Sequence, residues 1–304
     1  MKHSSSQATR DLLWVVNSPP LLITDQGGDE PIPEHQRLLQ ADIDAEHLNH
    51  FLTEHRSRRV GRYFEALVSY WLKHIRRVEI VAESETIYEG HRSVGEIDFV
   101  FYDEQRRLTH WEVAVKFYLF HSMRETLPGQ FIGPNAQDTL EQKRQKMLER
   151  QLPLSRNHFP AVEVRRPFLK GRLFYHNQDQ WTQNASEQIS IHHLTGDWCR
   201  NSELAAYLQT LFPQVAISQP SCDERQQIRF RLLEKPFWLA DEIVNKDDSL
   251  LLTPGPMLEM AERHFRSSNR CLLVAHLVQT GDSYREAGRF FVVPETWPEP
   301  RDSH

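Results

Sequence analysis

The sequence predicts an α/β protein whose mixed sheet is flanked by helices and is followed by an α+β region. Within residues 95–120, apolar side chains recur at every second position in two runs, the pattern of half-buried strands. Helical spacing of apolar residues precedes these runs at 58–75 and follows them at 138–152. Strands enclosed by amphipathic helices indicate a layered α/β fold.

The first 50 residues are expected to form an N-terminal extension containing a short helix. They combine the short apolar piece LLWVV with a loop, DQGGDEPIPEH, that is rich in proline and acidic residues. From Arg58 the pattern sharpens, because RVGRYFEALVSYWLKHI carries apolar side chains at helical spacing. Glu65 lies at the edge of the buried face of this predicted helix.

A strand and a turn, VEIVAESETIYEG, precede a predicted antiparallel hairpin. In its first strand, VGEIDFVF, the acidic Glu96 and Asp98 alternate with apolar residues. In its second strand, HWEVAVKFYLF, Glu112 and Lys116 lie opposite the face formed by tryptophan, valine and phenylalanine. DEQRR supplies the turn, so the charged side chains of both strands are expected on one side of the sheet.

The remaining elements are predicted from the same signals. A start signal resembling a capping box at Asp138 and Glu141 opens a helix, TLEQKRQKMLERQL, that is expected to end at Pro153. Further on we expect a strand at PFLKGRLFYH, a helix at SELAAYLQTLF, a strand through QIRFRLLEKPFWLA, a helix from PMLEMAERHF and a hairpin from CLLVAHLVQ to GRFFVVP. The polar stretch NQDQWTQNASEQ marks a weak boundary, which divides the chain into 1–50, a core at 51–176, and an α+β region at 177–304 that packs on the same sheet or beside it.

Composition narrows the class of protein. The 304 residues are 39% hydrophobic and 26% charged, as in soluble globular proteins, and we expect a cytoplasmic location and no membrane partner. No apolar run reaches the roughly 18 residues of a spanning helix, and the N-terminus lacks the features of a secretory signal. The three cysteines are far apart, which favours neither disulfides nor a zinc site. No GxGxxG or Walker-type loop is present, so no nucleotide cofactor is expected.

The charge is unevenly distributed. The formal net charge is -6, yet residues 50–175 contain 21 Lys and Arg against 16 Asp and Glu. Basic side chains cluster around the first long helix and in the helix after the hairpin; they are Arg56, Arg58, Arg59, Arg62, Lys73, Arg76, Arg77, Lys143, Arg144, Lys146 and Arg150. Such clusters are commonly solvated helix faces, and they are also where phosphates would bind.

Three carboxylates and a lysine are expected to converge on the charged side of the hairpin. They are Glu96, Asp98 and Glu112 with Lys116, beside the helix that carries Glu65. Mg²⁺ prefers oxygen ligands and commonly binds through one or two carboxylates, waters and a substrate phosphate. A metal ion with a lysine nearby is a set of groups that can catalyse phosphodiester hydrolysis.

This order of elements resembles the PD-(D/E)XK nuclease superfamily, which has the restriction-endonuclease-like fold, over about residues 58 to 151. In that resemblance Glu65 matches the helix carboxylate, Asp98 in GEIDFVF the motif aspartate, and Glu112 the carboxylate of the third motif. GEID followed by an acidic strand is also similar to small proteins related to Holliday-junction resolvases. The whole chain, with GPNAQDTLEQKRQKMLERQL, KPFWLA and RFFVVPETWP, resembles an uncharacterised bacterial family placed in the superfamily.

One position departs from the superfamily pattern. The usual lysine two residues after the third-motif carboxylate is replaced by Ala114, and Lys116 lies about 7 Å further along the same face. Lysine is long enough to reach back. The alternative is that the displacement marks a catalytically inactive module that binds nucleic acid or a protein partner.

The resemblance implies a Mg²⁺- or Mn²⁺-dependent nuclease acting on nucleic acid, with DNA favoured over RNA. Asp98 and Glu112 would hold the metal, Lys116 would position water or stabilise charge, and Glu65 would act through a water or a second metal. Glu96 would shape the site, and Gln142, Gln145 and Lys146 would contact phosphate. The sequence does not indicate an oligomeric state.

Overall fold

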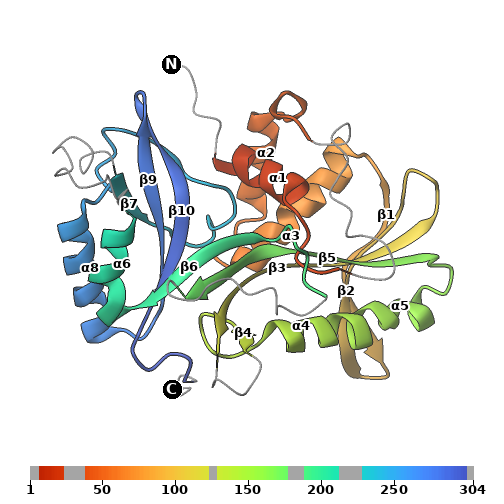
Figure 1. Ribbon diagram of the computed structural model, residues 1–304. Coiled ribbons are helices and arrows are strands. Elements are labelled where there is room, and N and C mark those ends of the chain that lie inside the picture. The colour runs from red at the N-terminus through yellow and green to blue at the C-terminus, as the bar shows by residue number, and fades with distance from the viewer. Residues whose placement is uncertain (1–6, 24–37, 123–128, 177–187, 212–227, 300–304) are drawn as a thin grey trace.

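The computed structural model describes residues 7–23, 38–122, 129–176, 188–211 and 228–299, and has the predicted α/β architecture with a large mixed sheet (Figure 1). The strands are β1 (Glu79–Glu89), β2 (Arg92–Tyr102), β3 (Leu108–His121), β4 (Gln130–Ile132), β5 (Val164–His176), β6 (Leu194–Arg200), β7 (Ile228–Leu232), β8 (Ile243–Asn245), β9 (Leu272–Thr280) and β10 (Ser283–Val293). Within the described residues they form one ten-stranded sheet of order β1-β2-β3-β5-β6-β10-β9-β7, with β4 beside β3 and β8 beside β10.

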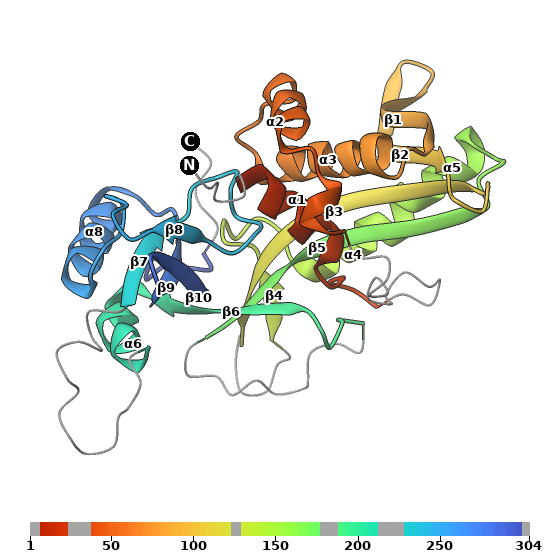
Figure 2. The same cartoon turned by 90° about the horizontal axis from the view of Figure 1, so that it is seen from above.

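Helices cover both faces of the sheet. They are α1 (Gln7–Asn17), α2 (Ala45–Glu54), α3 (Val60–Tyr70), α4 (Leu140–Lys146), α5 (Leu152–His158), α6 (Leu204–Thr210) and α8 (Pro254–Ser267). In Figure 1, α1, α2 and α3 lie on one side of β3 and β5, and α4 and α5 lie on the other. Seen from above, α6 and α8 lie with β7, β9 and β10 at the far end of the sheet (Figure 2). None of the described helices is long and apolar enough to cross a membrane.

The predicted hairpin is confirmed and is the centre of the sheet's first half. β2 pairs with β3 in antiparallel register from Tyr102–Leu108 to Phe99–Trp111. β3 then pairs in parallel with β5, and the helical segment α4–α5 connects the two strands. The two backbones approach so closely that a Cβ atom on Gly171 would lie 1.9 Å from the Lys116 carbonyl oxygen, so this position requires glycine.

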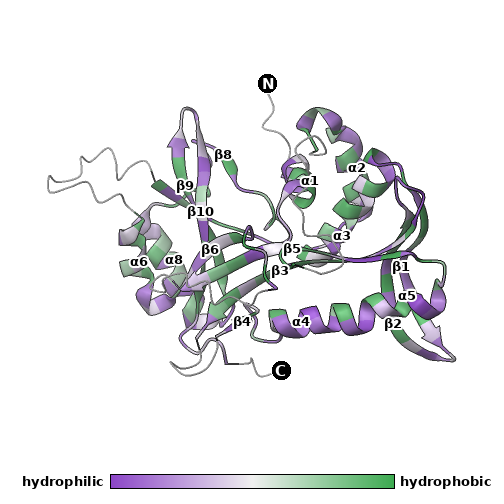
Figure 3. Ribbon diagram, turned by 45° about the vertical axis from the view of Figure 1, so that its right-hand side comes forward, coloured by the Kyte–Doolittle hydropathy of each residue, from purple (hydrophilic) through white to green (hydrophobic). Residues whose placement is uncertain are grey.

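Two hydrophobic clusters hold the helices against the sheet. Phe64 and Leu67 of α3 pack with Val113 and Phe117 of β3, in the same cluster as Leu12 of α1. On the opposite face, Leu140 and Met147 pack with Tyr118 and Leu173. Figure 3 shows hydrophilic and hydrophobic residues alternating along the helix that begins at α4. This helix is therefore amphipathic, with its apolar side on the sheet.

Two expected element ends were wrong. The helix beginning at Leu140 does not end at Pro153 but passes through a π-helical turn, Met147–Gln151, into α5. Pro153 then lies in the first turn of α5, where its missing N–H is tolerated. The strand expected through QIRFRLLEKPFWLA ends at Leu232, because Glu234 to Phe237 forms a turn closed by the Phe237 amide on the Glu234 carbonyl.

The weak boundary predicted near 176–190 falls largely on residues 177–187, which lie outside the described residues. On either side of it β5 pairs with β6 in parallel register, from Arg172–Leu194 to His176–Trp198. β6 in turn pairs in parallel with β10. The C-terminal elements thus extend the sheet that contains the hairpin.

Candidate functional site

Asp98 and Glu112 meet where β2 parts from β3. The ladder between the strands ends at Phe99–Trp111. Beyond it, the Val113 amide donates to Asp98 Oδ2 over 2.7 Å, so a side-chain oxygen takes the place of a strand carbonyl. The Glu112 side chain is fully buried beside it. The alternation of the sequence predicted this pairing of acidic residues on one side of the sheet.

Burial raises the pKa of both carboxyl groups to about 7. For Asp98, loss of solvation is the largest cause and the negative charge of Glu112 adds to it, while the hydrogen bond from Val113 opposes it. For Glu112, burial again dominates, and the Lys143 ammonium and a hydrogen bond with Asp98 oppose it. Acids this close titrate as a pair, which retains about one proton near neutral pH.

A chain of buried hydrogen bonds holds Glu112 in place. Arg165 Nε donates to Ser155 Oγ over 2.9 Å, and Ser155 Oγ lies 2.9 Å from His110 Nδ1. His110 Nε2 lies 2.9 Å from Glu112 Oε1, and Gln151 Nε2 donates to Glu112 Oε2 over 2.6 Å. Burial lowers the pKa of His110 to about 4, so the ring is neutral. The neutral ring therefore donates on one side of this chain and accepts on the other, and Ser155 Oγ also donates to the Leu152 carbonyl over 3.2 Å.

Ser155, His110 and Glu112 have the residue types of a nucleophilic triad, but they do not form one. All three side chains are 0% exposed, and a nucleophile must reach its substrate. Their arrangement orients the Glu112 carboxylate.

Lys143 of α4 faces the acidic pair. Its Nζ donates to Gln151 Oε1 over 3.1 Å, and Gln151 in turn bonds Glu112. The pKa of Lys143 is lowered, first by burial and then by the positive charge of Lys116, while Asp98 and Glu112 favour its charged form. An ammonium group on the helix therefore lies within electrostatic reach of both carboxylates.

The sequence analysis missed Lys143 and Gln151 as site residues. Lys143, Met147 and Gln151 recur at every fourth position, which places them on one helical face, and Met147 is fully buried against the sheet. That spacing was the available signal. Lys143 was instead grouped with the basic residues of a solvated helix face.

Glu65 and Glu96 lie at the more exposed side of the acidic pair. Arg62 Nη1 donates to Glu65 Oε2 over 2.8 Å and to Glu96 Oε1 over 3.3 Å. Burial raises the pKa of Glu65; the Arg62 charge opposes the shift, and the charges of Asp98 and Glu96 add to it. The structure therefore brings all four predicted carboxylates, including Glu112, into one electrostatically coupled group.

Lys116 borders the site but is bound elsewhere. Its Nζ donates to Asp138 Oδ2 over 2.7 Å, and the Tyr118 hydroxyl donates to the same oxygen over 3.0 Å. Its charge contributes to the lowered pKa of Lys143, so the two ammonium groups are neighbours. The hydrogen bond of Lys116 nevertheless goes to the loop before α4 and not to the acidic pair.

Gln142, Gln145 and Lys146 lie on the exposed side of α4. Gln142 forms the capping box with Thr139 at the start of the helix. Gln145 Nε2 donates to Glu149 over 3.0 Å. These residues face solvent, whereas Lys143 on the same helix faces the acidic pair.

The donor set of Asp98 and Glu112 fits a hard divalent cation. In the part of the chain that the structure describes, no group of three His, Cys, Asp or Glu side chains could hold a metal ion. Mg²⁺ commonly uses only one or two carboxylates and completes its shell with waters and substrate oxygens. Burial raises the pKa of both acids to about 7, and a bound divalent cation would favour their ionised forms.

The shared proton predicts an effect of pH on stability. Because the folded-state pKa of Asp98 is about 7, this group makes wild type lose stability as the pH rises from its unfolded pKa, about 4, through about 7. Asp98→Asn removes the ionisation. Relative to wild type, its free energy of unfolding should therefore increase between about pH 4 and 7, by up to about 1.4 kcal/mol per pH unit. Urea denaturation in chelator-containing buffer measures this; a pH-independent difference contradicts the pairing.

Comparison with known proteins identifies a family for this chain, but the description of that family names no activity. A family model described as a domain of unknown function, DUF1853, matches residues 10–293, from α1 to the last residue of β10. No curated protein and no solved structure matches the chain. The matched range covers more than half of the chain, and the protein therefore belongs to the DUF1853 family.

Proposed function

We propose that this protein is a metal-dependent nuclease of the PD-(D/E)XK type that hydrolyses phosphodiester bonds in nucleic acid, with DNA favoured. One observation carries the proposal. The half-buried Asp98 and the fully buried Glu112 lie side by side on neighbouring strands where the strands part, and the Lys143 ammonium faces them. Two carboxylates and an ammonium group match the needs of phosphoryl chemistry at a metal.

The side chains of the site would have two roles: some would hold the metal or orient its ligands, and one would stabilise negative charge on the phosphate. Asp98 and Glu112 would hold Mg²⁺ or Mn²⁺, which lowers the pKa of a bound water and neutralises phosphate charge. Gln151 and His110 fix the orientation of Glu112. Lys143 would stabilise the negative charge that develops on the phosphate.

Exposed arginines beside the acidic group support a polyanionic substrate. Arg56, Arg58 and Arg59 are exposed in the segment that leads into α3. Arg62, one turn further on, reaches Glu65 and Glu96 with a side chain that is 51% exposed. Nucleic acid bound at these residues would release counterions, so its affinity should fall steeply with salt.

A metal titration tests the proposal. We expect calorimetry with Mg²⁺ and Mn²⁺ to detect binding to wild type that Asp98→Asn and Glu112→Gln both remove. Glu141→Gln is the matched control, because Glu141 is an exposed carboxylate in the first turn of α4. A folded wild type that binds neither metal, alone or with a phosphorothioate-protected oligonucleotide present, would overturn the metal-dependent reading.

A catalytically inactive binding module is the second candidate, and three hydrogen bonds favour it. Both Glu112 oxygens are already hydrogen-bonded, to His110 and to Gln151, and the strand lysine Lys116 is bound to Asp138. Such a module would bind nucleic acid in a salt-sensitive way with no change on adding Mg²⁺. Metal binding that Asp98→Asn removes would favour the nuclease, and its absence would favour the binding module.

A further inference from the structure

A pocket of about 430 Å³ lies outside the acidic group, between the loop before α4 and two C-terminal segments. Its walls come from Pro134 and Asn135 of that loop, from Glu234, Lys235 and Trp238 after β7, and from Arg270 and Cys271 before β9. Distant parts of the sequence thus form it. Its volume is within the range of small-molecule sites, about 300–1,000 Å³.

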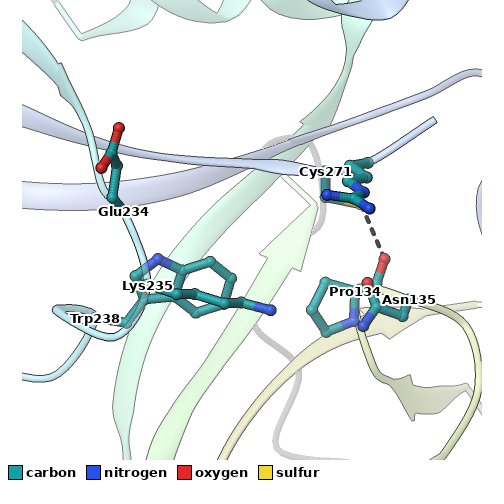
Figure 4. Close-up of a pocket in the computed structure, with 7 residues that line it drawn as sticks. Pro134, Asn135, Glu234, Lys235, Trp238 and Cys271 are labelled. Atoms are coloured by element: carbon teal, nitrogen blue, oxygen red, sulfur yellow. Dashed lines mark hydrogen bonds between the residues drawn. The ribbon is translucent and has the colours of Figure 1, made fainter. Parts of the chain in front are cut away.

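The charge directed into this pocket is positive. Figure 4 shows the Lys235 ammonium extending across Trp238 toward Pro134 and Asn135, while the Glu234 carboxylate points away from it. Lys235 Nζ lies 4.6 Å from the centre of the indole ring. Arg270 adds a second exposed cation to the lining. Two cations from separate segments favour a ligand with two negative charges.

The floor and walls of the pocket are fixed by contacts to the core. Trp238 is 7% exposed and packs edge-to-face on Phe117, with ring centres 5.5 Å apart. Its indole N–H donates to the Leu233 carbonyl, so the buried ring offers the pocket no hydrogen-bond donor. The Cys271 thiol donates to the Pro134 carbonyl over 3.0 Å, which joins the two opposite walls. A preformed site loses little entropy on binding.

We propose that this pocket binds a small phosphate monoester. Lys235 and Arg270 pair with the phosphate oxygens, and the Asn135 amide supplies a neutral hydrogen bond to the same ligand. Inorganic phosphate alone would leave most of the volume empty, so the ligand carries an organic group that occupies the rest of the pocket. The source is either a free metabolite or the phosphorylated end of a nucleic acid, since both present this chemistry.

Titration calorimetry of the full chain at low ionic strength tests this, with adenosine 5′-monophosphate and adenosine as the paired probes. We expect the monophosphate to bind and adenosine not to bind. Arg270→Gln and Lys235→Gln should each weaken binding about tenfold or more, because each removes a charged hydrogen bond. Arg266→Gln is the matched control, an exposed arginine on α8 that does not line the pocket.

A second pair of probes distinguishes the sources. Binding of a 5′-phosphorylated dinucleotide with the same dependence on Arg270 identifies a nucleic-acid end as a ligand, whereas binding of the mononucleotide alone identifies a free metabolite. The proposal is overturned if a folded wild type binds neither phosphorylated probe. It is also overturned if Arg270→Gln and Lys235→Gln, checked by thermal melting, bind as wild type does.

Discussion

Under the proposed nuclease function, Asp98→Asn is expected to reduce cleavage of nucleic acid at least about 100-fold while the protein stays folded, since it removes one of the two negative charges that would hold the metal. The amide keeps an oxygen that accepts from the Val113 N–H, so the edge of β3 retains its hydrogen bond. The measurement is single-turnover cleavage of labelled DNA and RNA, in single- and double-stranded form, with Mg²⁺ and with Mn²⁺.

The control for this prediction is Glu141→Gln, which removes a carboxylate exposed on α4 and should cleave as wild type does. Glu112→Gln should reduce cleavage to a similar extent as Asp98→Asn, because the two carboxyl groups lie side by side and burial raises the pKa of both. The stability of Glu112→Gln must be measured separately, since the new amide group replaces a carboxylate whose oxygen lies 2.9 Å from His110 Nε2. If folded Asp98→Asn cleaved nucleic acid at the wild-type rate, Asp98 would have no role in the cleavage reaction.

The hairpin and its acidic pair could be predicted from sequence because period-two alternation is a local signal. Residues 96–101 and 111–118 each show which side chains share a face, and the short turn between them fixes the antiparallel pairing. Given that register, Asp98 and Glu112 must lie on one side. The same local signal predicted α3, with Glu65 at its edge.

The partners of the acidic pair could not be predicted in the same way, because they are set by long-range packing. Ser155 reaches His110 only because α5 continues beyond Pro153 and lies against β3, and a proline is ordinarily a signal that a helix ends. Arg165 joins them from β5, whose parallel pairing with β3 depends on the crossover through α4 and α5. Nothing within one element shows that these side chains meet.

A lysine that shares a strand face with the acids does not always direct its ammonium group toward them, as Lys116 shows. Lys116 was expected near the acids because its position in the strand shares a face with Glu112, and the face was correct. Its side chain, however, is directed to Asp138, which follows β4 in the loop before α4. Ala114, between Glu112 and Lys116 on that face, packs against the cluster that contains Leu140 and Met147, and Lys143 approaches the acids from the same helix.

Lys143→Met is therefore expected to be the more damaging of two lysine substitutions, lowering kcat about 100-fold or more by loss of charge stabilisation at the phosphate. Lys116→Met should lower it no more than about tenfold, because Lys116 acts on the site only through space. Methionine keeps the apolar stem of lysine and limits the loss of packing. Cleavage kinetics of both variants, beside Lys246→Met as a control at an exposed lysine that follows β8, make the comparison.

The pH profile separates an electrostatic role of Lys143 from a structural one. The Lys143 ammonium holds down the pKa of Asp98 and Glu112, so its removal should raise both further and move the acid limb of the rate profile to higher pH. Lys143→Arg retains the charge and should restore the position of that limb, with partial recovery of rate. If Lys143→Met and Lys143→Arg lose the same cleavage rate and the acid limb of the pH–rate profile does not move, the role of Lys143 is in the packing of α4. If Lys116→Met loses more cleavage rate than Lys143→Met, the catalytic lysine is Lys116 on the strand.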